Sequence, residues 1–272
     1  MSSKVKQITI GVFDSGMGGL TVLKQLLALI PDANYLYFGD TARLPYGSKS
    51  AETVAKYALG ATDFLEKQGA NFLVIACNTA TALALDKITQ SAHVPVVGVV
   101  EPGAEHAAAS SKKRKVVVIG TEATINSHAY HKALKSRGVD AREKACPLFV
   151  PLVEEGWAEH SVTEEIAKIY LDEAFKDGFE SADVLVLGCT HYPLIKPVLD
   201  RISPANVEIV DSAESTAKAV AEKLGIVPGD ANQKHSGSLK FFATDSVEKF
   251  RRLGAKFLGR PIDVVEHVDL KE

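Results

Sequence analysis

Residues 187–193 read LGCTHYP, and residues 75–80 read IACNTA. Both stretches contain an apolar run, a small residue and a cysteine that is followed by hydroxyl or amide side chains. A short apolar run that stops at polar residues is typical of a buried strand. The two matched motifs therefore indicate that Cys77 and Cys189 are delivered by two strands to one site, from two sides.

Strands and helices are expected to alternate along the chain. Residues 8–13 predict a strand that enters the glycine-rich turn DSGMGG, and a helix follows up to Pro31. Alternation of this kind implies βαβ units and mainly parallel sheets. Further strands are expected over 35–40, 72–76, 94–100, 116–120, 184–187, 207–210 and 239–243, with an extended piece over 146–151. Helices are expected over 51–68, 80–89, 162–175, 212–224 and 246–258, with one containing His128 and His131.

The chain also carries a weak internal repeat. The spacing from Asp14 to Cys77 is close to the spacing from Thr121 to Cys189. A length of 272 residues suits two compact domains. We predict an α/β fold of two doubly wound, mainly parallel-sheet domains: residues 1–100 with 209–272, carrying Cys77, and residues 101–208, carrying Cys189. The last strand and helix have no repeat partner, so they are expected to return to the first domain.

Composition narrows the class of protein. A hydrophobic fraction of 46% with 24% charged residues is typical of a soluble globular protein. The net charge of −3 does not indicate binding to nucleic acid or to an anionic membrane. Three cysteines are too few for a disulfide framework. No apolar run is long enough for a membrane span, and the first is too short for a signal peptide, so a cytoplasmic location is expected.

The glycine-rich turn does not fit the common nucleotide motifs. A Walker A loop would need lysine after the second glycine, where Met17 stands, and a dinucleotide fingerprint would need glycine where Thr21 stands. Phosphate binding and a purely structural turn both stay open at this point. The favoured interpretation is a loop that presents Asp14 and Ser15 at the carboxyl end of a strand, where open α/β sheets bind ligands.

Several chemistries could use two thiols. The Cys-x-x-Cys spacing of a redox pair is absent. A structural zinc site needs four ligands, whereas Cys77, Cys189 and His191 supply three, so no metal is expected. A Cys-His nucleophile would explain Cys189 with His191 but leave Cys77 idle. Cys146 precedes Pro147 without polar followers, and we interpret it as a small buried hydrophobe.

Two-base proton exchange uses both thiols. One thiolate removes a proton from a carbon, and the opposite thiol protonates its other face, so the centre is inverted. A helix N-terminus after each cysteine is expected to lower the thiol pKa. Donors are needed to stabilise the carbanion, and Ser15, Asn78, Thr79 and Thr190 are the candidates.

Motifs in the same order along the chain resemble those of the glutamate racemases, in the aspartate/glutamate racemase family. They are FDSGMGGLTV, GDTARLPYGSKS, ACNTATA, VGVVEPG, VIGTEATINS, CPLFVPLVEEGW, LGCTHYPLI and VDSAES. The resemblance implies two α/β domains related by a pseudo-twofold axis, with the active site between them. It also implies an isomerase that interconverts L- and D-glutamate without cofactor or metal, and so supplies D-glutamate for peptidoglycan synthesis, cell wall biogenesis and cell shape.

The resemblance also assigns roles to residues. Cys77 and Cys189 would be the acid/bases, acting on the D and the L isomer respectively. Asp14 would assist Cys77, and His191 with Glu154 would assist Cys189. The implied substrate contacts are Asp14, Ser15, Tyr46, Gly47, Asn78, Thr79, Thr121, Thr124, Thr190 and His191. Glutamate is then the expected partner, with neither nucleic acid nor membrane, and the sequence is compatible with a homodimer.

Two other functions stay open. An aspartate racemase would share the motifs and differ in pocket size near Tyr46 and Thr121. A non-catalytic binding protein would have little use for two opposed thiols. Some members of the resembled family carry a longer N-terminal segment associated with activation by a peptidoglycan precursor; only a short segment precedes the first expected strand here, so activator dependence is not expected.

Overall fold

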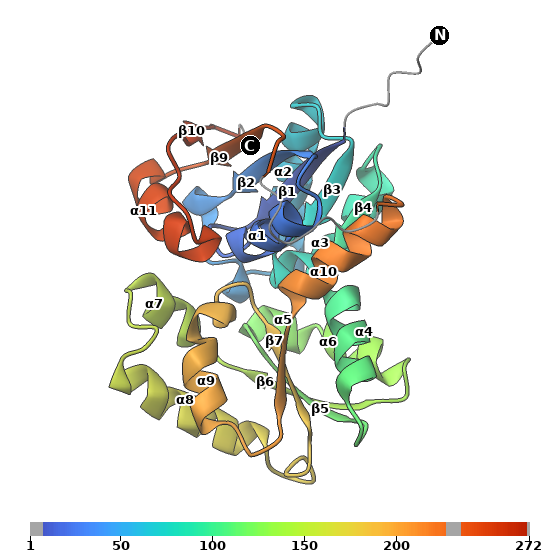
Figure 1. Ribbon diagram of the computed structural model, residues 1–272, viewed down its shortest axis with the longest axis vertical. Coiled ribbons are helices and arrows are strands. Elements are labelled where there is room, and N and C mark those ends of the chain that lie inside the picture. The colour runs from blue at the N-terminus through green and yellow to red at the C-terminus, as the bar shows by residue number, and fades with distance from the viewer. Residues whose placement is uncertain (1–7, 227–234, 271–272) are drawn as a thin grey trace.

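The computed structural model describes residues 8–226 and 235–270, and in Figure 1 they form two lobes, one above the other. A sheet of six strands occupies the upper lobe in the order β10-β9-β2-β1-β3-β4. The lower lobe contains a sheet of four strands in the order β6-β5-β7-β8. Every pairing within these two sheets is parallel. The first sheet comprises β1 (Thr9–Asp14), β2 (Asn34–Gly39), β3 (Phe72–Ile75), β4 (Val96–Gly98), β9 (Leu239–Ala243) and β10 (Glu266–His267), and the second comprises β5 (Lys115–Gly120), β6 (Asp140–Ala145), β7 (Val184–Gly188) and β8 (Glu208–Asp211).

The two sheets repeat one topology. In the first sheet β1 lies between β2 and β3, with β4 outside β3; in the second sheet β5 lies between β6 and β7, with β8 outside β7. Strands β3 and β7 therefore occupy equivalent places. Cys77 follows β3 and Cys189 follows β7, so the two cysteines stand at matching carboxyl ends. The internal repeat inferred from the sequence is a repeat of strand order.

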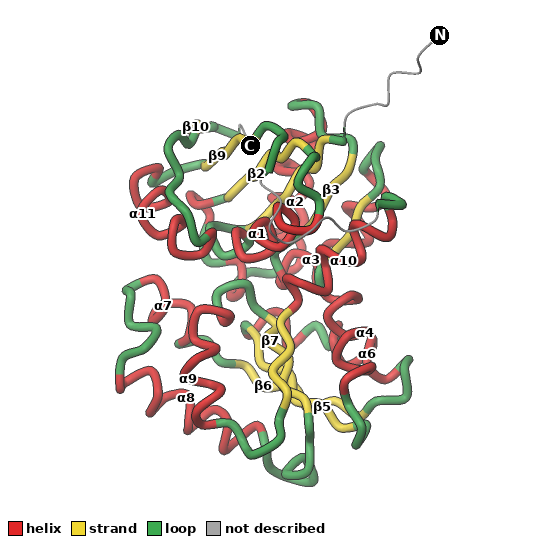
Figure 2. The backbone as a smooth tube through the Cα atoms, viewed as in Figure 1, coloured by secondary structure: helices red, strands yellow, loops and turns green. Residues whose placement is uncertain are grey.

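Helices cover both faces of the sheets, as Figure 2 shows by colour. Successive residues of a strand point to opposite faces. In β1, Val12 packs into the core under α1 and Phe13 into the core under α2 and α3. Each fully buried apolar side chain of this kind contributes roughly 1.5–3 kcal/mol of transfer free energy. The helices are α1 (Leu20–Leu29), α2 (Ala51–Lys67), α3 (Asn78–Ser91), α4 (Val100–Ser110), α5 (Glu122–Asn126), α6 (Ala129–Lys135), α7 (Phe149–Glu154), α8 (Ser161–Ala174), α9 (Lys196–Ile202), α10 (Ser212–Lys223) and α11 (Val247–Leu258), with short 3-10 segments at Thr41–Arg43, Tyr46–Ser48 and Tyr192–Ile195.

The C-terminal part of the chain returns to the first lobe, as predicted. Strand β9 pairs with β2, and α11 packs against α1. Helix α10 packs against α1 and also against α4, so it lies where the two lobes meet. Strand β8 belongs to the second sheet and ends at Asp211, and the predicted domain boundary between residues 208 and 209 therefore falls inside this strand.

Two local predictions were wrong. Residues 146–151 are not extended, because helix α7 begins at Phe149; Pro151 is tolerated there since the first N–H groups of a helix have no intrahelical partner. The expected helix through His128 is divided, because His128 takes a left-handed conformation (φ 56°) between α5 and α6.

Strand β6 was not predicted. Its sequence DAREKA is polar and none of its residues is buried, since it lies at the edge of the sheet.

Within residues 8–226 and 235–270, no helix combines the length and the apolar character needed to cross a membrane.

Candidate active site

A cavity of about 340 Å³ lies between the lobes, at the carboxyl ends of β1, β3 and β7. This volume is at the lower end of the range for small-molecule sites. Both Cys77 and Cys189 line it. The wall residues are Ser15, Leu44, Pro45, Tyr46, Gly47, Ser48, Cys77, Asn78, Thr79, Thr121, Glu122, Pro147, Val150, Pro151, Glu154, Glu155, Gly188, Cys189, Thr190 and His191.

Cys77 is the N-cap residue of α3. Its thiol donates to the Ser15 hydroxyl at 3.5 Å and accepts the Ala80 backbone N–H at 3.4 Å. Burial, followed by the nearby charge of Asp14, raises the pKa of the Cys77 thiol to about 12, although the hydrogen bonds that the Ser15 hydroxyl and the Ala80 N–H can donate to a thiolate oppose this. The expectation that the helix N-terminus would lower this pKa was wrong, because the loss of solvation outweighs the helix contribution. Cys77 is therefore a protonated thiol at neutral pH.

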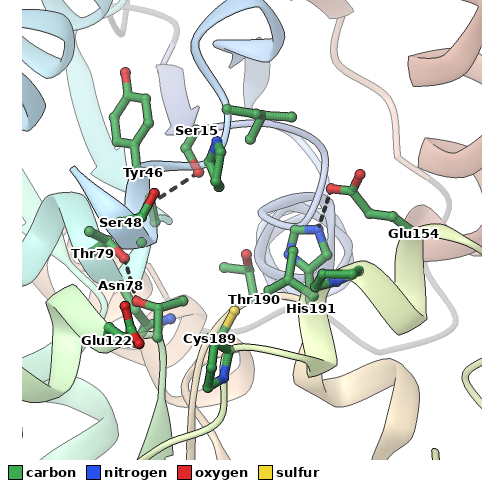
Figure 3. Close-up of a pocket in the computed structure, with 18 of the residues that line it drawn as sticks. Ser15, Tyr46, Ser48, Asn78, Thr79, Glu122, Glu154, Cys189, Thr190 and His191 are labelled. Atoms are coloured by element: carbon green, nitrogen blue, oxygen red, sulfur yellow. Dashed lines mark hydrogen bonds and ion pairs between the residues drawn. The ribbon is translucent and has the colours of Figure 1, made fainter.

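The opposite wall holds Cys189, Thr190 and His191 in sequence. Figure 3 shows the imidazole of His191 directed toward Glu154, and Nε2 lies 3.3 Å from Glu154 Oε1. Burial alone would lower the pKa of His191, but hydrogen bonds to Cys189 and Glu154 outweigh it and raise the pKa to about 10. This histidine is an imidazolium next to Cys189.

Glu154 connects the two lobes at this wall. Its Oε2 accepts a hydrogen bond of 2.8 Å from Lys249 Nζ on α11. The hydrogen bond from His191, and then that from Lys249, lowers the pKa of Glu154 to about 2. The carboxylate is thus charged and bonded on both oxygens.

Asp14 is fully buried and is not among the residues that line the cavity. Its Oδ2 accepts the Gly16 backbone N–H at 2.9 Å, and its Oδ1 accepts the Thr190 hydroxyl at 3.4 Å. Burial raises its pKa, while the charge of His191 opposes the shift. Asp14 therefore ties the first lobe to the loop that carries Cys189.

Three threonine hydroxyls form a triangle between the lobes. Thr79 lies 2.9 Å from Thr121 and 3.1 Å from Thr124, and Thr121 lies 2.9 Å from Thr124. Figure 3 shows the Thr79 end of this triangle at the cavity wall. Thr124 itself is fully buried and lies behind the wall.

Tyr46 borders the cavity, but its hydroxyl does not face it. The hydroxyl donates to Asp40 Oδ2 at 2.6 Å, and the ring extends away from the cavity in Figure 3. Gly47 lies where the lobes approach closely, since a Cβ there would come within 2.8 Å of Thr121 Cβ. This loop can offer its backbone to a ligand.

Asn78 follows Cys77 and supplies an amide to the wall. Its Oδ1 accepts the Tyr130 hydroxyl at 2.7 Å, whereas its Nδ2 is buried without a hydrogen-bond partner. The arrangement thus offers thiols from two sides, an imidazolium beside one of them, and donors suited to an anionic ligand.

The structure brings most of the predicted site residues to one cavity. Ser15, Gly47, Thr79, Thr121, Glu154 and Thr190 line it together with Tyr46, Asn78, His191 and both cysteines. Asp14 and Thr124 lie in the layer behind. His128 and His131 are elsewhere and bond Glu143 and the Ala141 carbonyl. Three wall residues were not predicted from the sequence: Ser48, Glu122 and Glu155. Each directly follows a predicted site residue in the sequence, and this adjacency could have revealed them. Tyr130 and Lys249, which lie behind the wall, were also not predicted.

Comparisons with known proteins agree with this geometry. The profile of the Asp/Glu/hydantoin racemase family matches residues 11–220. A glutamate racemase of Koribacter versatilis is 62% identical over 96% of this chain and 97% of its own length. Among solved structures, a glutamate racemase isoform from Bacillus anthracis superposes with a TM-score of 0.88 at 36% identity, covering 97% of this chain and 98% of its own. The glutamate racemase of Francisella tularensis in complex with D-glutamate superposes with a TM-score of 0.86 at 35% identity and the same coverage. The chain belongs to the Asp/Glu/hydantoin racemase family.

Proposed function

We propose that this enzyme interconverts L- and D-glutamate, with Cys77 and Cys189 as the two acid/base groups. The observation that carries the proposal is the position of the cysteines: they follow equivalent strands of two repeated sheets and line one cavity. Glutamate is supported by the names of the relatives that match over nearly the full length. The bound D-glutamate of one structural neighbour supports it further.

The reaction is a transfer of two protons. A thiolate takes the proton from the α-carbon, and its electron pair stays on that carbon. The opposite thiol then gives its proton to the other face, so the configuration is inverted. The enzyme begins with one thiol and one thiolate and ends with their roles exchanged, and proton exchange with water restores the first state.

The protonated state of Cys77 and the charge of His191 favour one direction of proton transfer. With its pKa raised to about 12, Cys77 holds a proton to donate at neutral pH. On the other wall, the His191 imidazolium can hydrogen-bond a Cys189 thiolate. This form of the site suits removal of the proton from L-glutamate by Cys189 and delivery of a proton by Cys77. The reverse reaction starts from the exchanged form.

The barrier requires strong stabilisation of the carbanion. A turnover near 10 per second corresponds to roughly 16 kcal/mol. At about 1.36 kcal/mol per unit, the carbon acid can lie no more than about 12 pKa units above its base. An amino-acid α-carbon in water is far weaker than this, so donors aimed at the carboxylate must make up the difference. Ser15, Asn78, Thr79 and Thr190 are the donors we assign to that task.

The remaining residues take supporting roles in this proposal. Asp14 assists Cys77 from behind the wall, and Glu154 holds His191 beside Cys189. Tyr46 and Gly47 offer backbone groups to the substrate. Thr121 also contacts substrate, and Thr124 supports it through the hydroxyl triangle. As further parts of the proposal, the product supplies peptidoglycan synthesis and the enzyme works in the cytoplasm. The chain divides into two domains, with β8 up to Asp211 kept whole in the second.

Deuterium incorporation tests the proposal. L- or D-glutamate is incubated with the enzyme in heavy water, and early product and recovered substrate are analysed by mass spectrometry and chiral separation. The two-base mechanism gives product labelled at the α-carbon and substrate with little label. Rapid labelling of substrate without inversion would overturn it. The same assay with aspartate decides the substrate, since inversion of aspartate in preference to glutamate would reject glutamate.

A further inference from the structure

Asn78 carries an unsatisfied donor inside the candidate site. The residue is only 3% exposed and lines the cavity, and its Nδ2 has no hydrogen-bond partner. A buried amide N–H group without a partner is costly, and native proteins rarely leave one unpaired. The group is therefore a place for an acceptor on the ligand, such as a carboxylate oxygen.

Tyr130 holds the other end of this amide. It lies on α6 of the second lobe, is fully buried, and donates to Asn78 Oδ1 at 2.7 Å. The single proton of the Tyr130 hydroxyl is thus directed to Asn78, and Oδ1 is the amide atom that can receive it.

The packing around the Tyr130 hydroxyl leaves it little freedom. A Cβ at Gly103 on α4 would lie 3.2 Å from this oxygen and 3.2 Å from Ser212 Cβ. Helices α4, α6 and α10 therefore meet tightly at the tyrosine oxygen. The hydroxyl reaches from the second lobe to the first residue of α3 in the first lobe.

We propose that Tyr130 is a positioning residue, whose hydrogen bond to Oδ1 turns the Asn78 N–H₂ group toward the cavity to bind a substrate carboxylate. The inference rests on the proposed function, because the carboxylate is that of glutamate. In the opposite amide orientation the carbonyl oxygen would face the carboxylate and repel it. This donor therefore depends on both lobes: Asn78 of the first lobe supplies the N–H₂ group, and Tyr130 of the second lobe orients it.

The test compares Tyr130→Phe, Asn78→Ala and the double variant in glutamate racemisation. Loss of one such bond reduces kcat/KM by about tenfold. The substrate carboxylate is charged in the ground state and gains further charge in the carbanion, so KM rises and kcat falls for both enantiomers. If Tyr130 acts through Asn78, Tyr130→Phe has no further effect on kcat/KM once Asn78 is alanine. Additive losses would overturn the inference, as would a wild-type KM in Tyr130→Phe.

Tyr35→Phe is the matched control. Tyr35 is also fully buried, and its hydroxyl donates to the carbonyls of Leu26 and Ile30, away from the cavity. Both phenylalanine variants lower the melting temperature, but only Tyr130→Phe changes KM. Equal changes of KM in the two would show a general structural effect and overturn the inference.

A second variant tests the same geometry without altering Tyr130. In Asn78→Asp, Tyr130 holds one carboxylate oxygen and the other faces the substrate carboxylate, so KM rises well above that of Asn78→Ala. Equal KM values in these two variants would overturn the inference. A wild-type enzyme that leaves glutamate unchanged would reject the proposed function itself, a result distinct from normal racemisation with an unaltered Tyr130→Phe.

Discussion

Lys249 of α11 donates a hydrogen bond of 2.8 Å to Glu154 of α7, and so joins the last helix of the first lobe to the wall that holds His191. The other oxygen of Glu154 bonds the imidazole. A charge on the first lobe therefore helps to place the group that accompanies Cys189.

Replacing Lys249 by methionine should weaken this arrangement. Glu154 loses a charged donor and holds His191 less firmly, so we expect kcat/KM for glutamate to fall about fivefold. Steady-state kinetics of both enantiomers measures the change. Lys218→Met is the control, because Lys218 pairs with Glu214 on the exposed surface of α10. Unchanged kinetics in Lys249→Met would show that the contact is incidental.

Cys77→Ser and Cys189→Ser should each reduce racemisation by at least about a thousandfold, since a serine hydroxyl is a far weaker acid than a thiol. Cys146→Ala is the control: this third cysteine is fully buried and its thiol contacts the Lys144 carbonyl, away from the cavity. The Cys146→Ala variant should have a lower free energy of unfolding and an unchanged kcat. A serine variant with wild-type turnover would remove that cysteine from the mechanism.

The His191 and Glu154 pair predicts a pH dependence of stability. The pKa of His191 is raised to about 10, so its contribution is complete below the unfolded value near 6.5 and is lost as pH rises toward 10. The pKa of Glu154 is lowered to about 2, so its contribution is complete above 4.5 and is lost as pH falls toward 2. Urea unfolding between pH 6.5 and pH 10 should show a loss of a few kcal/mol.

Two variants locate the source of that loss. In Glu154→Gln the free energy of unfolding should fall less steeply between pH 6.5 and pH 10, because one of the hydrogen bonds that raise the pKa of His191 is weakened. In His93→Gln it should keep its wild-type slope, since His93 pairs with Glu66 at the exposed surface. If the free energy of unfolding fell equally with pH in the wild type and in Glu154→Gln, the pair of His191 and Glu154 would not be the cause of the loss.

Gly18→Ala should disturb the Cys189 loop from the opposite lobe. A Cβ at Gly18 would lie 2.6 Å from His191 Nδ1, so the loop must shift. A displacement of about 1 Å near the reacting groups can cost about a hundredfold in rate, and we expect kcat/KM to fall at least tenfold. Gly60→Ala is the control, because its nearest neighbour would be Leu270 Cδ1 at 4.0 Å and α2 gains a better helix former. Full activity in Gly18→Ala would contradict the close packing.

Buried strands and the two cysteine motifs were predictable because their signal is local. Apolar runs such as residues 72–75 and 184–187 lie in the sheet centres, where burial on both faces leaves a continuous hydrophobic stretch. Strand β6 has no such run, since an edge strand whose residues are only partly buried can be polar. The short helix α7 was hidden by Pro147 before it and Pro151 within it, since prolines usually indicate extended or turn structure.

The supporting residues of the site could not be found in the same way. Tyr130 and Lys249 bond Asn78 and Glu154, which are far from them in sequence, and no motif links the partners. The protonated state of Cys77 was also hidden, because it depends on how deeply the folded lobes bury the thiol. Such properties arise only when the lobes are in contact.

The triangle of Thr79, Thr121 and Thr124 has a consequence for the joint between the lobes. Three hydroxyls have three protons, and three mutual hydrogen bonds use all of them. In the proposed complex, a carboxylate can accept a proton from Thr79 only if that hydroxyl turns away from its neighbour in the second lobe. Substrate binding at Thr79 and cohesion of the lobes would then compete for the same hydrogen atom, and the filled enzyme would be joined at this point by one hydrogen bond fewer than the empty one.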